Sequence, residues 1–280
     1  MRVLIVGYGK LGSAFAQITR AAGHECWALS RSGRDAPHAT MLRGDVTDPA
    51  TIPKLDPVDA VVYCVSATER TDAGYRDAYP VGLRNIVNAL HDSSEATRLL
   101  FVSSTGVYGQ DDGSWVDESA ATTPTRFQGA RMVEAEHIAL DSGLTASCLR
   151  LGGIYGPERT YLLVSVKRGA VQLDSQVRHW TNRIHSHDAA RAMLHVLGLE
   201  RAPQFLNVCD CEPALRDDVL RWIAARTGVS SEAPTDGGDE TLARPETGKR
   251  VSVARLLDTG FAHVYPTFRE GYGALADQSL

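Results

Sequence analysis

Short apolar runs alternate with longer amphipathic stretches over the first half of the chain. The apolar runs are rich in Val, Leu and Cys and contain few alternating polar residues, which is typical of strands covered on both faces of a sheet. This order predicts a parallel, doubly wound α/β sheet with right-handed crossovers. The predicted strands are residues 2–6, 25–30, 41–44, 60–64, 99–103 and 145–149.

Helical spacing of apolar residues predicts the helices between these strands. The clearest are residues 79–90 and 127–142, and a further helix is expected over 13–22. In the less regular second half we expect a helix over 189–199, capped by the side chain of Asp188. That half is also predicted to contain a strand over 205–208 and a helix over 213–226.

The first predicted strand leads directly into the pattern Gly7-x-Gly9-x-x-Gly12 and then into a helix. In this context Gly7 permits a tight turn, Gly9 lets backbone approach a pyrophosphate, and Gly12 lets the helix lie close to the strand. The helix N-terminus offers N–H groups and a partial positive charge to phosphates. A purely structural turn is the alternative. The candidate phosphate-binding residues are Gly7, Tyr8, Gly9, Lys10, Leu11 and Gly12.

A chain of 280 residues with 43% apolar residues can form a large domain and a smaller one. We expect a dinucleotide-binding domain over 1–152 and a smaller α/β substrate-side domain over 153–280, with part of 175–205 returning to the first. The ligand cleft is expected at the carboxyl ends of the strands. Residues 230–249 are polar and lack periodicity, which predicts a mobile loop over a substrate cleft.

Charge and cysteine content narrow the class of partner. The net charge is −5 and no Lys/Arg run stands out, so nucleic acid and anionic membranes are disfavoured. No apolar run is long enough to span a bilayer. Five scattered cysteines suit a reducing, cytoplasmic setting, with Cys26, Cys64 and Cys148 as buried thiols. No metal site is expected, since Cys209-x-Cys211 lacks a second pair and residues 185–188 lack a further carboxylate.

The segment after the second predicted strand indicates which nicotinamide dinucleotide, NAD(H) or NADP(H), the protein binds. An Asp or Glu there would bind the ribose hydroxyls of NAD, but residues 30–34 contain no carboxylate. Arg31 and Arg34, with the hydroxyls of Ser30 and Ser32, would instead meet a 2′-phosphate through charge-assisted hydrogen bonds. The sequence therefore predicts NADP(H) rather than NAD(H). The alternative is that both arginines are solvated loop residues.

Other strand ends supply further candidate cofactor contacts. Asp45, followed by Val46, is placed to accept a hydrogen bond from an adenine amino group, or to cap the next turn. Small residues at the end of the fourth strand would let backbone lie along the adenosine half. Gly153 follows the sixth strand, where backbone could meet a carboxamide. Both segments could equally be strand ends with small packing residues. The fourth-strand candidates are Cys64, Val65 and Ser66.

Three further segments, taken with the N-terminal turn, resemble the extended, epimerase/dehydratase-like branch of the short-chain dehydrogenase/reductase superfamily. They are Phe101-Val-Ser-Ser-Thr-Gly-Val-Tyr-Gly109, Leu149-Arg-Leu-Gly-Gly-Ile-Tyr-Gly-Pro157 and Arg183-Ile-His-Ser-His-Asp188. The resemblance implies that Ser103 and Ser104 lie beside the nicotinamide and that Ser104 hydrogen-bonds the reacting oxygen. It also implies that His185 lines the cleft. Alternatively, both serines satisfy backbone groups at a strand end.

The resemblance also implies a Tyr and a Lys one helical turn apart as the acid–base pair. The matching positions here are Phe127 and Arg131. Arg131 can hold ribose hydroxyls, whereas Phe127 cannot transfer a proton. Substitute donors would be Tyr108, Tyr155 or Tyr161. The glycine turn differs as well, since this branch usually has GxxGxxG. Both departures indicate an atypical subgroup.

Two hypotheses about function follow. One is an NADP(H)-dependent oxidoreductase or epimerase/dehydratase-like protein acting on a small hydroxy, keto or sugar-nucleotide compound. The other is a catalytically silent NADP(H)-binding module that senses redox state or regulates a partner. The resemblance further implies that the helices over 79–90 and 127–142 can pair across a homodimer.

Overall fold

A computed structural model of the protein describes residues 1–90, 97–171, 173, 176–229 and 244–277. The chain forms two compact units. The first comprises Met1–Gly109, Ala121–Leu151 and Ala189–Leu206. The second comprises Gln110–Ala120, Gly152–Asp188 and Asn207–Leu280. The sequence did not indicate that residues 110–120 belong with the second unit.

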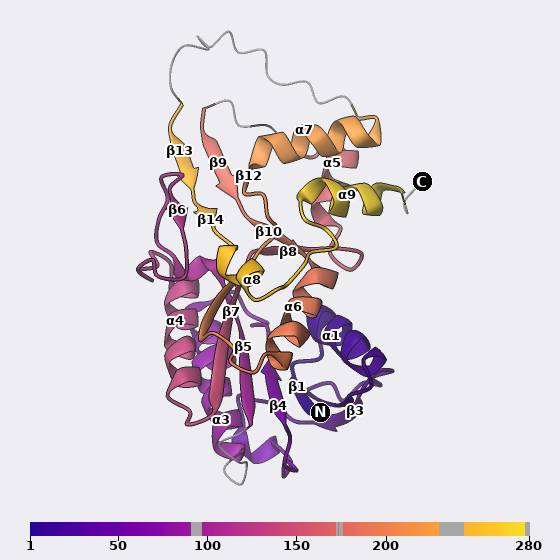
Figure 1. The fold of residues 1–280 in the computed structure, drawn as a ribbon, viewed down its shortest axis with the longest axis vertical. Coiled ribbons are helices and arrows are strands. Elements are labelled where there is room, and N and C mark those ends of the chain that lie inside the picture. The colour runs from indigo at the N-terminus through magenta and orange to yellow at the C-terminus, as the bar shows by residue number, and fades with distance from the viewer. Residues whose placement is uncertain (91–96, 172, 174–175, 230–243, 278–280) are drawn as a thin grey trace. The chain divides into compact units, whose positions relative to one another are not determined.

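A seven-stranded parallel sheet forms the centre of the first unit, which confirms the predicted doubly wound α/β class (Figure 1). The chain builds outward from β1 in one direction through β2 and β3, and then in the other direction from β4. The order therefore reverses between β1 and β4, where such sheets bind ligands. In spatial order the strands are β11 (Phe205–Val208), β7 (Thr145–Leu151), β5 (Arg98–Ser104), β4 (Ala60–Tyr63), β1 (Arg2–Val6), β2 (Glu25–Ser30) and β3 (Thr40–Arg43).

The apolar runs became strands because both sheet faces are covered. All four residues of β4 and four of the five residues of β1 are buried. The predicted bounds of β1, β2 and β11 match the structure, and the other strand ends shift by one or two residues.

Helices cover both faces of this sheet. Figure 1 shows α1 (Lys10–Ala21) and α6 (Ser186–Gly198) on one side, and α3 (Gly82–Ala89) and α4 (Phe127–Leu140) on the other. Helix α1 turns Leu11, Phe15 and Ala16 into the core, at the spacing expected of one helical face. It begins three residues before the predicted start.

The predicted helix over 79–90 is wrong at its start. The chain is already helical at Asp72, through α2 (Asp72–Arg76), a π-helical turn η2 (Asp77–Val81) and then α3. The Thr71 hydroxyl caps α2 by accepting a hydrogen bond from the Gly74 N–H at 3.1 Å. Gly74 and Pro80 weaken the helical pattern in the sequence, although Thr71 followed by Asp72 is a recognisable start signal.

The second unit is built from short strands and helices. Its sheets are β10 (Arg183–His185) with β8 (Gly153–Tyr155), β12 (Ala214–Leu215) with β9 (Arg178–Thr181) and β13 (Glu246–Gly248), and β14 (Arg250–Val251) with β6 (Trp115–Val116). Its helices are α5 (Tyr161–Lys167), α7 (Arg216–Thr227), α8 (Ala254–Asp258) and α9 (Phe268–Asp277). The two remaining short helical turns, η1 (Pro49–Thr51) and η3 (Thr105–Val107), lie in the first unit.

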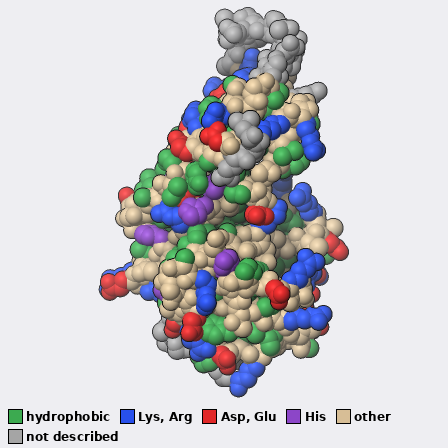
Figure 2. Space-filling model, turned by 90° about the vertical axis from the view of Figure 1, so that its right-hand side faces the viewer, with side chains coloured by type: hydrophobic (Ala, Val, Ile, Leu, Met, Phe, Trp, Pro, Cys, Tyr) green, Lys and Arg blue, Asp and Glu red, His purple; other side chains and the backbone are tan. Residues whose placement is uncertain are grey.

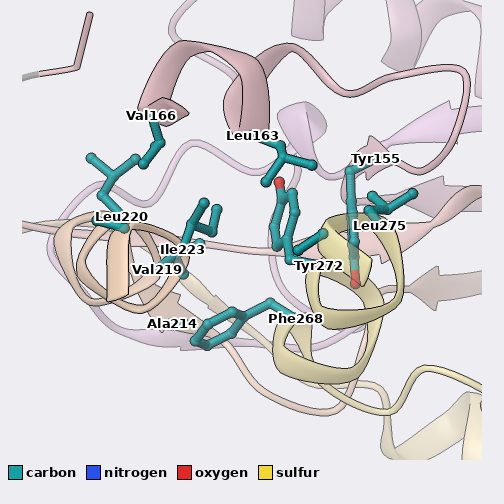
Figure 3. Close-up of a cluster of buried hydrophobic side chains, with 12 residues drawn as sticks. Tyr155, Leu163, Val166, Ala214, Val219, Leu220, Ile223, Phe268, Tyr272 and Leu275 are labelled. Carbon is teal, nitrogen blue, oxygen red and sulfur yellow. The ribbon is translucent and has the colours of Figure 1, made fainter. Parts of the chain in front are cut away.

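A stacked pair of phenol rings lies in the core of the second unit. The Tyr155 and Tyr272 rings are 4.4 Å apart at 22°, with their oxygens at opposite ends of the pair (Figure 3). Leu163 of α5 and Ile223 of α7 are buried in the same cluster. A Cβ at Gly271 would lie 1.9 Å from the Tyr155 oxygen, so the packing of α9 on this pair requires glycine there.

Three local predictions in the second half need correction. Helix α6 begins at Ser186, so Asp188 lies within its first turn and is not the N-cap residue. The Asp188 carboxylate instead accepts hydrogen bonds from the N–H groups of Val264 and Tyr265 at 3.0 and 2.7 Å. Residues 214–215 form β12 ahead of α7, where a helix was predicted. The predicted loop falls on residues 230–243, which lie outside the described residues, but its last part contains β13.

Charge and cysteine placement complete the description. On the face drawn in Figure 2, basic and acidic side chains are interspersed. Among the described residues, no helix is both long and apolar enough to cross a membrane. All five cysteines are free thiols; Cys26, Cys148 and Cys209 are buried, Cys64 is half-buried and Cys211 is exposed.

A buried ionic cluster ties β5, α4 and β7 together in the first unit. Arg150 makes a bidentate contact with Glu136, with hydrogen bonds of 3.0 and 2.8 Å, and donates to the Tyr108 hydroxyl at 3.0 Å. The Ser103 hydroxyl donates to Glu136 at 2.6 Å. Ser103 is only 3% exposed and does not line the cavity described below, so the structure does not place its side chain at the predicted cofactor site. Its side chain satisfies the buried carboxylate, which would otherwise be costly to desolvate.

Replacing Arg150 by Met should lower the free energy of unfolding by about 3–5 kcal/mol, because the Glu136 carboxylate stays buried without its cation. The second change Glu136→Leu in the same chain should recover much of that loss, since an apolar pair needs no charge compensation. Urea unfolding of the two variants measures both effects. Wild-type stability of the single variant would contradict this account of the cluster.

Candidate functional site

A cavity of about 700 Å³ opens at the carboxyl ends of β1, β2 and β4, at the point where the strand order reverses. All of its lining belongs to the first unit. Nine of the residues predicted to bind a cofactor line it, namely Gly7, Tyr8, Gly9, Arg31, Asp45, Val46, Cys64, Val65 and Ser66. The fold therefore brings together, on one cavity, candidate residues that the sequence analysis had found in segments far apart in the chain.

The glycine turn sets the floor of this cavity. Gly7 has φ of +98°, which a residue with a side chain rarely adopts. A Cβ at Gly12 would lie 2.2 Å from the Gly7 carbonyl oxygen, so the helix can approach the strand only with glycine there. A Cβ at Gly9 would have no atom within 4 Å. Gly9 therefore serves no packing need, and its backbone stays accessible from the cavity.

The N-terminus of α1 meets the cavity at Gly9, which is the N-cap residue and makes no side-chain capping bond. The first turn contains no acidic residue. The first N–H groups of a helix lack partners within it and carry a partial positive charge. Lys10, Leu11 and Gly12 lie in this turn but do not line the cavity; Lys10 is exposed, and Leu11 and Gly12 are buried. The arrangement suits a phosphate group.

Polar groups gather where β2 ends. Arg31 lines the cavity, and its Nη2 donates to the Thr68 hydroxyl at 2.5 Å, linking the loop after β2 to the loop after β4. Ser30 and Ser32 also line it. Arg34 is exposed and lies off the lining. No carboxylate occurs in residues 30–34, so the only charged side chain of this segment on the cavity is a cation.

The next strand end supplies Asp45 and Val46. One Asp45 oxygen accepts hydrogen bonds from the Thr47 N–H and hydroxyl at 2.9 and 2.8 Å, which is the turn-capping arrangement. The Val46 carbonyl accepts from the Asn85 side chain at 2.8 Å, which fixes this wall to α3. The carboxylate still lines the cavity.

Cys64 packs the glycine turn from the β4 side. Its thiol donates to the Gly7 carbonyl oxygen at 3.1 Å. Burial raises the pKa of this thiol to about 12, so Cys64 stays protonated and acts as a packing and hydrogen-bonding group.

One wall of the cavity was not expected from the sequence. It consists of Ala73 and Gly74 of α2 with Asp77 and Ala78 of η2. Pro80 has no N–H to continue the α-helical ladder, and the Gly82 N–H reaches the Asp77 carbonyl in the wider turn. The Tyr63 hydroxyl donates to the Ala78 carbonyl at 2.5 Å, which holds this turn against the end of β4.

The three predicted catalytic positions cluster around the start of α4. Ser104 ends β5, is half-buried, and accepts a hydrogen bond from the Gly106 N–H at 3.1 Å, as the structural alternative predicts. Phe127 is the first residue of α4, and its ring meets that of Tyr75 edge-on at 5.6 Å.

Arg131 is engaged by carboxylates. It makes two hydrogen bonds of 2.8 Å to Asp72 and one of 2.9 Å to Glu134. The predicted role of Arg131 in holding ribose is therefore not seen; it joins α2 to α4 instead. Hydrogen bonding to Arg131 lowers the pKa of the Asp72 carboxyl.

Gly153 lies in the second unit and off the cavity. It belongs to β8, and its N–H donates to the Asn182 carbonyl at 2.9 Å, so this N–H is not available to a carboxamide. His185 is 3% exposed, and its ring centroid lies 3.9 Å from that of Tyr265. Burial lowers the pKa of His185 to about 4, so the ring is neutral near pH 7.

The tyrosines considered as substitute donors are poorly placed for that role. Tyr108 is buried against Arg150, and Tyr155 is buried in the core of the second unit. Tyr161 is 83% exposed on α5.

Comparison with known proteins identifies the family. The sequence model of the NAD-dependent epimerase/dehydratase family matches residues 3–209. The chain belongs to this family. A solved structure from Methylobacillus flagellatus assigned to the same family is 33% identical, with a TM-score of 0.83 over 100% of this chain and 99% of that one.

The chain is also similar to more distant proteins, one by sequence and one by structure. Protein YeeZ of Escherichia coli strain K12 is 25% identical over 95% of this chain and 96% of its own length. The human epimerase family protein SDR39U1, solved with NADPH, is 18% identical, with a TM-score of 0.78 over 99% of each chain. As a member of this family, the chain is an epimerase-like protein of the class that binds nicotinamide dinucleotides.

The glycine turn provides a matched pair of substitutions. Gly12→Ala should lower the free energy of unfolding by about 3 kcal/mol, since its Cβ would overlap a backbone oxygen that cannot move away. Gly9→Ala should change it by at most about 1 kcal/mol, because the added methyl group meets open space. Thermal or urea unfolding measures both values. Equal losses would show that the close helix–strand approach is not what requires glycine.

Proposed function

We propose that the protein binds NADP(H) in the cavity of the first unit and acts on a small hydroxy, keto or sugar-nucleotide compound as an oxidoreductase or epimerase. The observation that carries this proposal is the pairing, on one cavity, of the α1 N-terminus with the Arg31 guanidinium. The first suits a pyrophosphate and the second suits a 2′-phosphate. The NADPH bound to human SDR39U1 is consistent with it.

The residues present fit such a dinucleotide. Open space at Gly9 leaves room for a pyrophosphate against the backbone, and Ser30 and Ser32 add hydroxyls beside Arg31. The Asp45 carboxylate lies on the same cavity and can accept a hydrogen bond from an adenine amino group. A bound nicotinamide supplies or accepts a hydride. Ser104, at the end of β5, can donate a hydrogen bond to a substrate oxygen.

A specific observation favours a second candidate, a silent NADP(H)-binding module. Phe127 has no exchangeable proton, and Arg131 is paired with Asp72 and Glu134. A site without a proton donor would lose about 10²–10⁴-fold in rate. The two candidates share the cofactor site and differ only in whether another group transfers the proton.

The Arg31→Ala variant should bind NADPH about 10–100-fold more weakly than wild type, because a charge-assisted hydrogen bond to phosphate contributes about 1.5–3 kcal/mol. Its affinity for NADH should change little. Arg34→Ala is the matched control, since Arg34 lies off the cavity and its removal should leave both affinities near wild type. Quenching of tryptophan fluorescence measures all of them. Tighter binding of NADH than of NADPH by wild type would overturn the proposed preference.

A further inference from the structure

Helices α2 and α4 meet along a seam of two side-chain contacts. Arg131 and Asp72 form a bidentate ion pair with hydrogen bonds of 2.8 Å. One helical turn further along α2, the Tyr75 ring meets Phe127, one turn earlier on α4, at 5.6 Å and 89°. The ion pair thus fixes the register of the two helices and holds the Tyr75 phenol beside position 127.

Tyr75 lies at the edge of the candidate site. Its neighbour Gly74 and, two residues on, Asp77 both line the cavity. The start of α4 packs against the loop after Ser104, because a Cβ at Gly129 would lie 2.3 Å from the Gly106 carbonyl oxygen. The seam therefore places Tyr75 and the end of β5 at the same end of α4.

The hydroxyl of Tyr75 differs from the other phenols of the first unit. It makes no hydrogen bond within the described part of the chain, and the residue is half-buried. The other phenol groups are bonded or buried: Tyr63 donates to Ala78, Tyr108 bonds to Arg150, Tyr79 bonds to the Ala67 backbone, and the Tyr8 oxygen is buried. Tyr75 thus retains an accessible proton beside the site.

We propose that Tyr75 is the proton donor and acceptor of this site, an inference that rests on the proposed function. In carbonyl reduction, a bound reduced nicotinamide would supply the hydride that the carbonyl carbon accepts, and would itself be oxidised. The Tyr75 O–H bond breaks and its proton passes to the carbonyl oxygen, which completes the alcohol. The phenolate then takes a proton from water. Alcohol oxidation follows the same path in reverse.

A first experiment asks whether Tyr75 meets the bound dinucleotide. Protein labelled with ¹³Cζ-tyrosine contains nine tyrosine signals, and the signal absent from Tyr75→Phe is that of Tyr75. We expect this signal to shift when NADP⁺ is added, while the signal absent from Tyr161→Phe stays in place. Calorimetry on the same samples measures NADP⁺ binding. Absence of binding would refute the proposed function, whereas binding with an unmoved Tyr75 signal would refute this inference alone.

A second experiment measures proton transfer, with 9,10-phenanthrenequinone as the carbonyl probe and NADPH oxidation as the readout. Tyr75→Phe should lower kcat about 100-fold and leave the KM for NADPH unchanged. The matched control Tyr79→Phe should stay within about twofold of wild type, since the Tyr79 oxygen is bonded to the Ala67 backbone and so, unlike that of Tyr75, is not free to exchange a proton with a substrate.

A third experiment tests whether a phenol introduced on α4, at position 127, can replace the Tyr75 phenol. Phe127→Tyr in the Tyr75→Phe background should recover at least about tenfold of the lost kcat, because the two rings are in contact. A Tyr75→Phe variant with wild-type kcat would overturn the inference. If wild type does not turn over the quinone, the tyrosine signal decides the question.

Discussion

The close approach of α1 to β1 is the constraint on which the first unit depends. Gly12 has room for hydrogen but not for a methyl group against the Gly7 carbonyl oxygen, and the Cys64 thiol bonds to the same oxygen from β4. One carbonyl therefore joins the turn, the helix and the central pair of strands. Because this contact sets the position of the α1 N-terminus, it also sets where an anion can meet unpaired N–H groups.

The part of the cavity lining formed by α2 and η2 depends on an irregular helical turn. A proline within a helical segment prevents regular α-helical hydrogen bonding, and the chain widens into a π turn. The fully buried phenol of Tyr63, which belongs to the sheet, then donates a hydrogen bond to the Ala78 carbonyl within this turn. The cavity lining thus includes both a close glycine contact and an irregular helix. Only the first of these has a strong sequence signature.

This difference explains what could be predicted. The Val- and Leu-rich strands and the glycine spacing report local physics, so the sheet, its class and nine cavity residues follow from the sequence. The roles of Ser103, Arg131 and Gly153 depend on partners far away in the chain. Glu136, Asp72 and Asn182 have no spacing relationship to them that a single sequence reveals. The same holds for the edge-on contact of Tyr75 with Phe127.

The second unit pairs strands that lie far apart in the sequence. Strand β6, at Trp115–Val116, pairs in parallel with β14 at Arg250–Val251, which the ribosome makes roughly 130 residues later. At about 5–20 residues per second, residues 110–120 wait on the order of ten seconds for their partner strand. During synthesis, the strands of the first unit can thus begin to pair before β6 and β14 of the second unit can pair with each other.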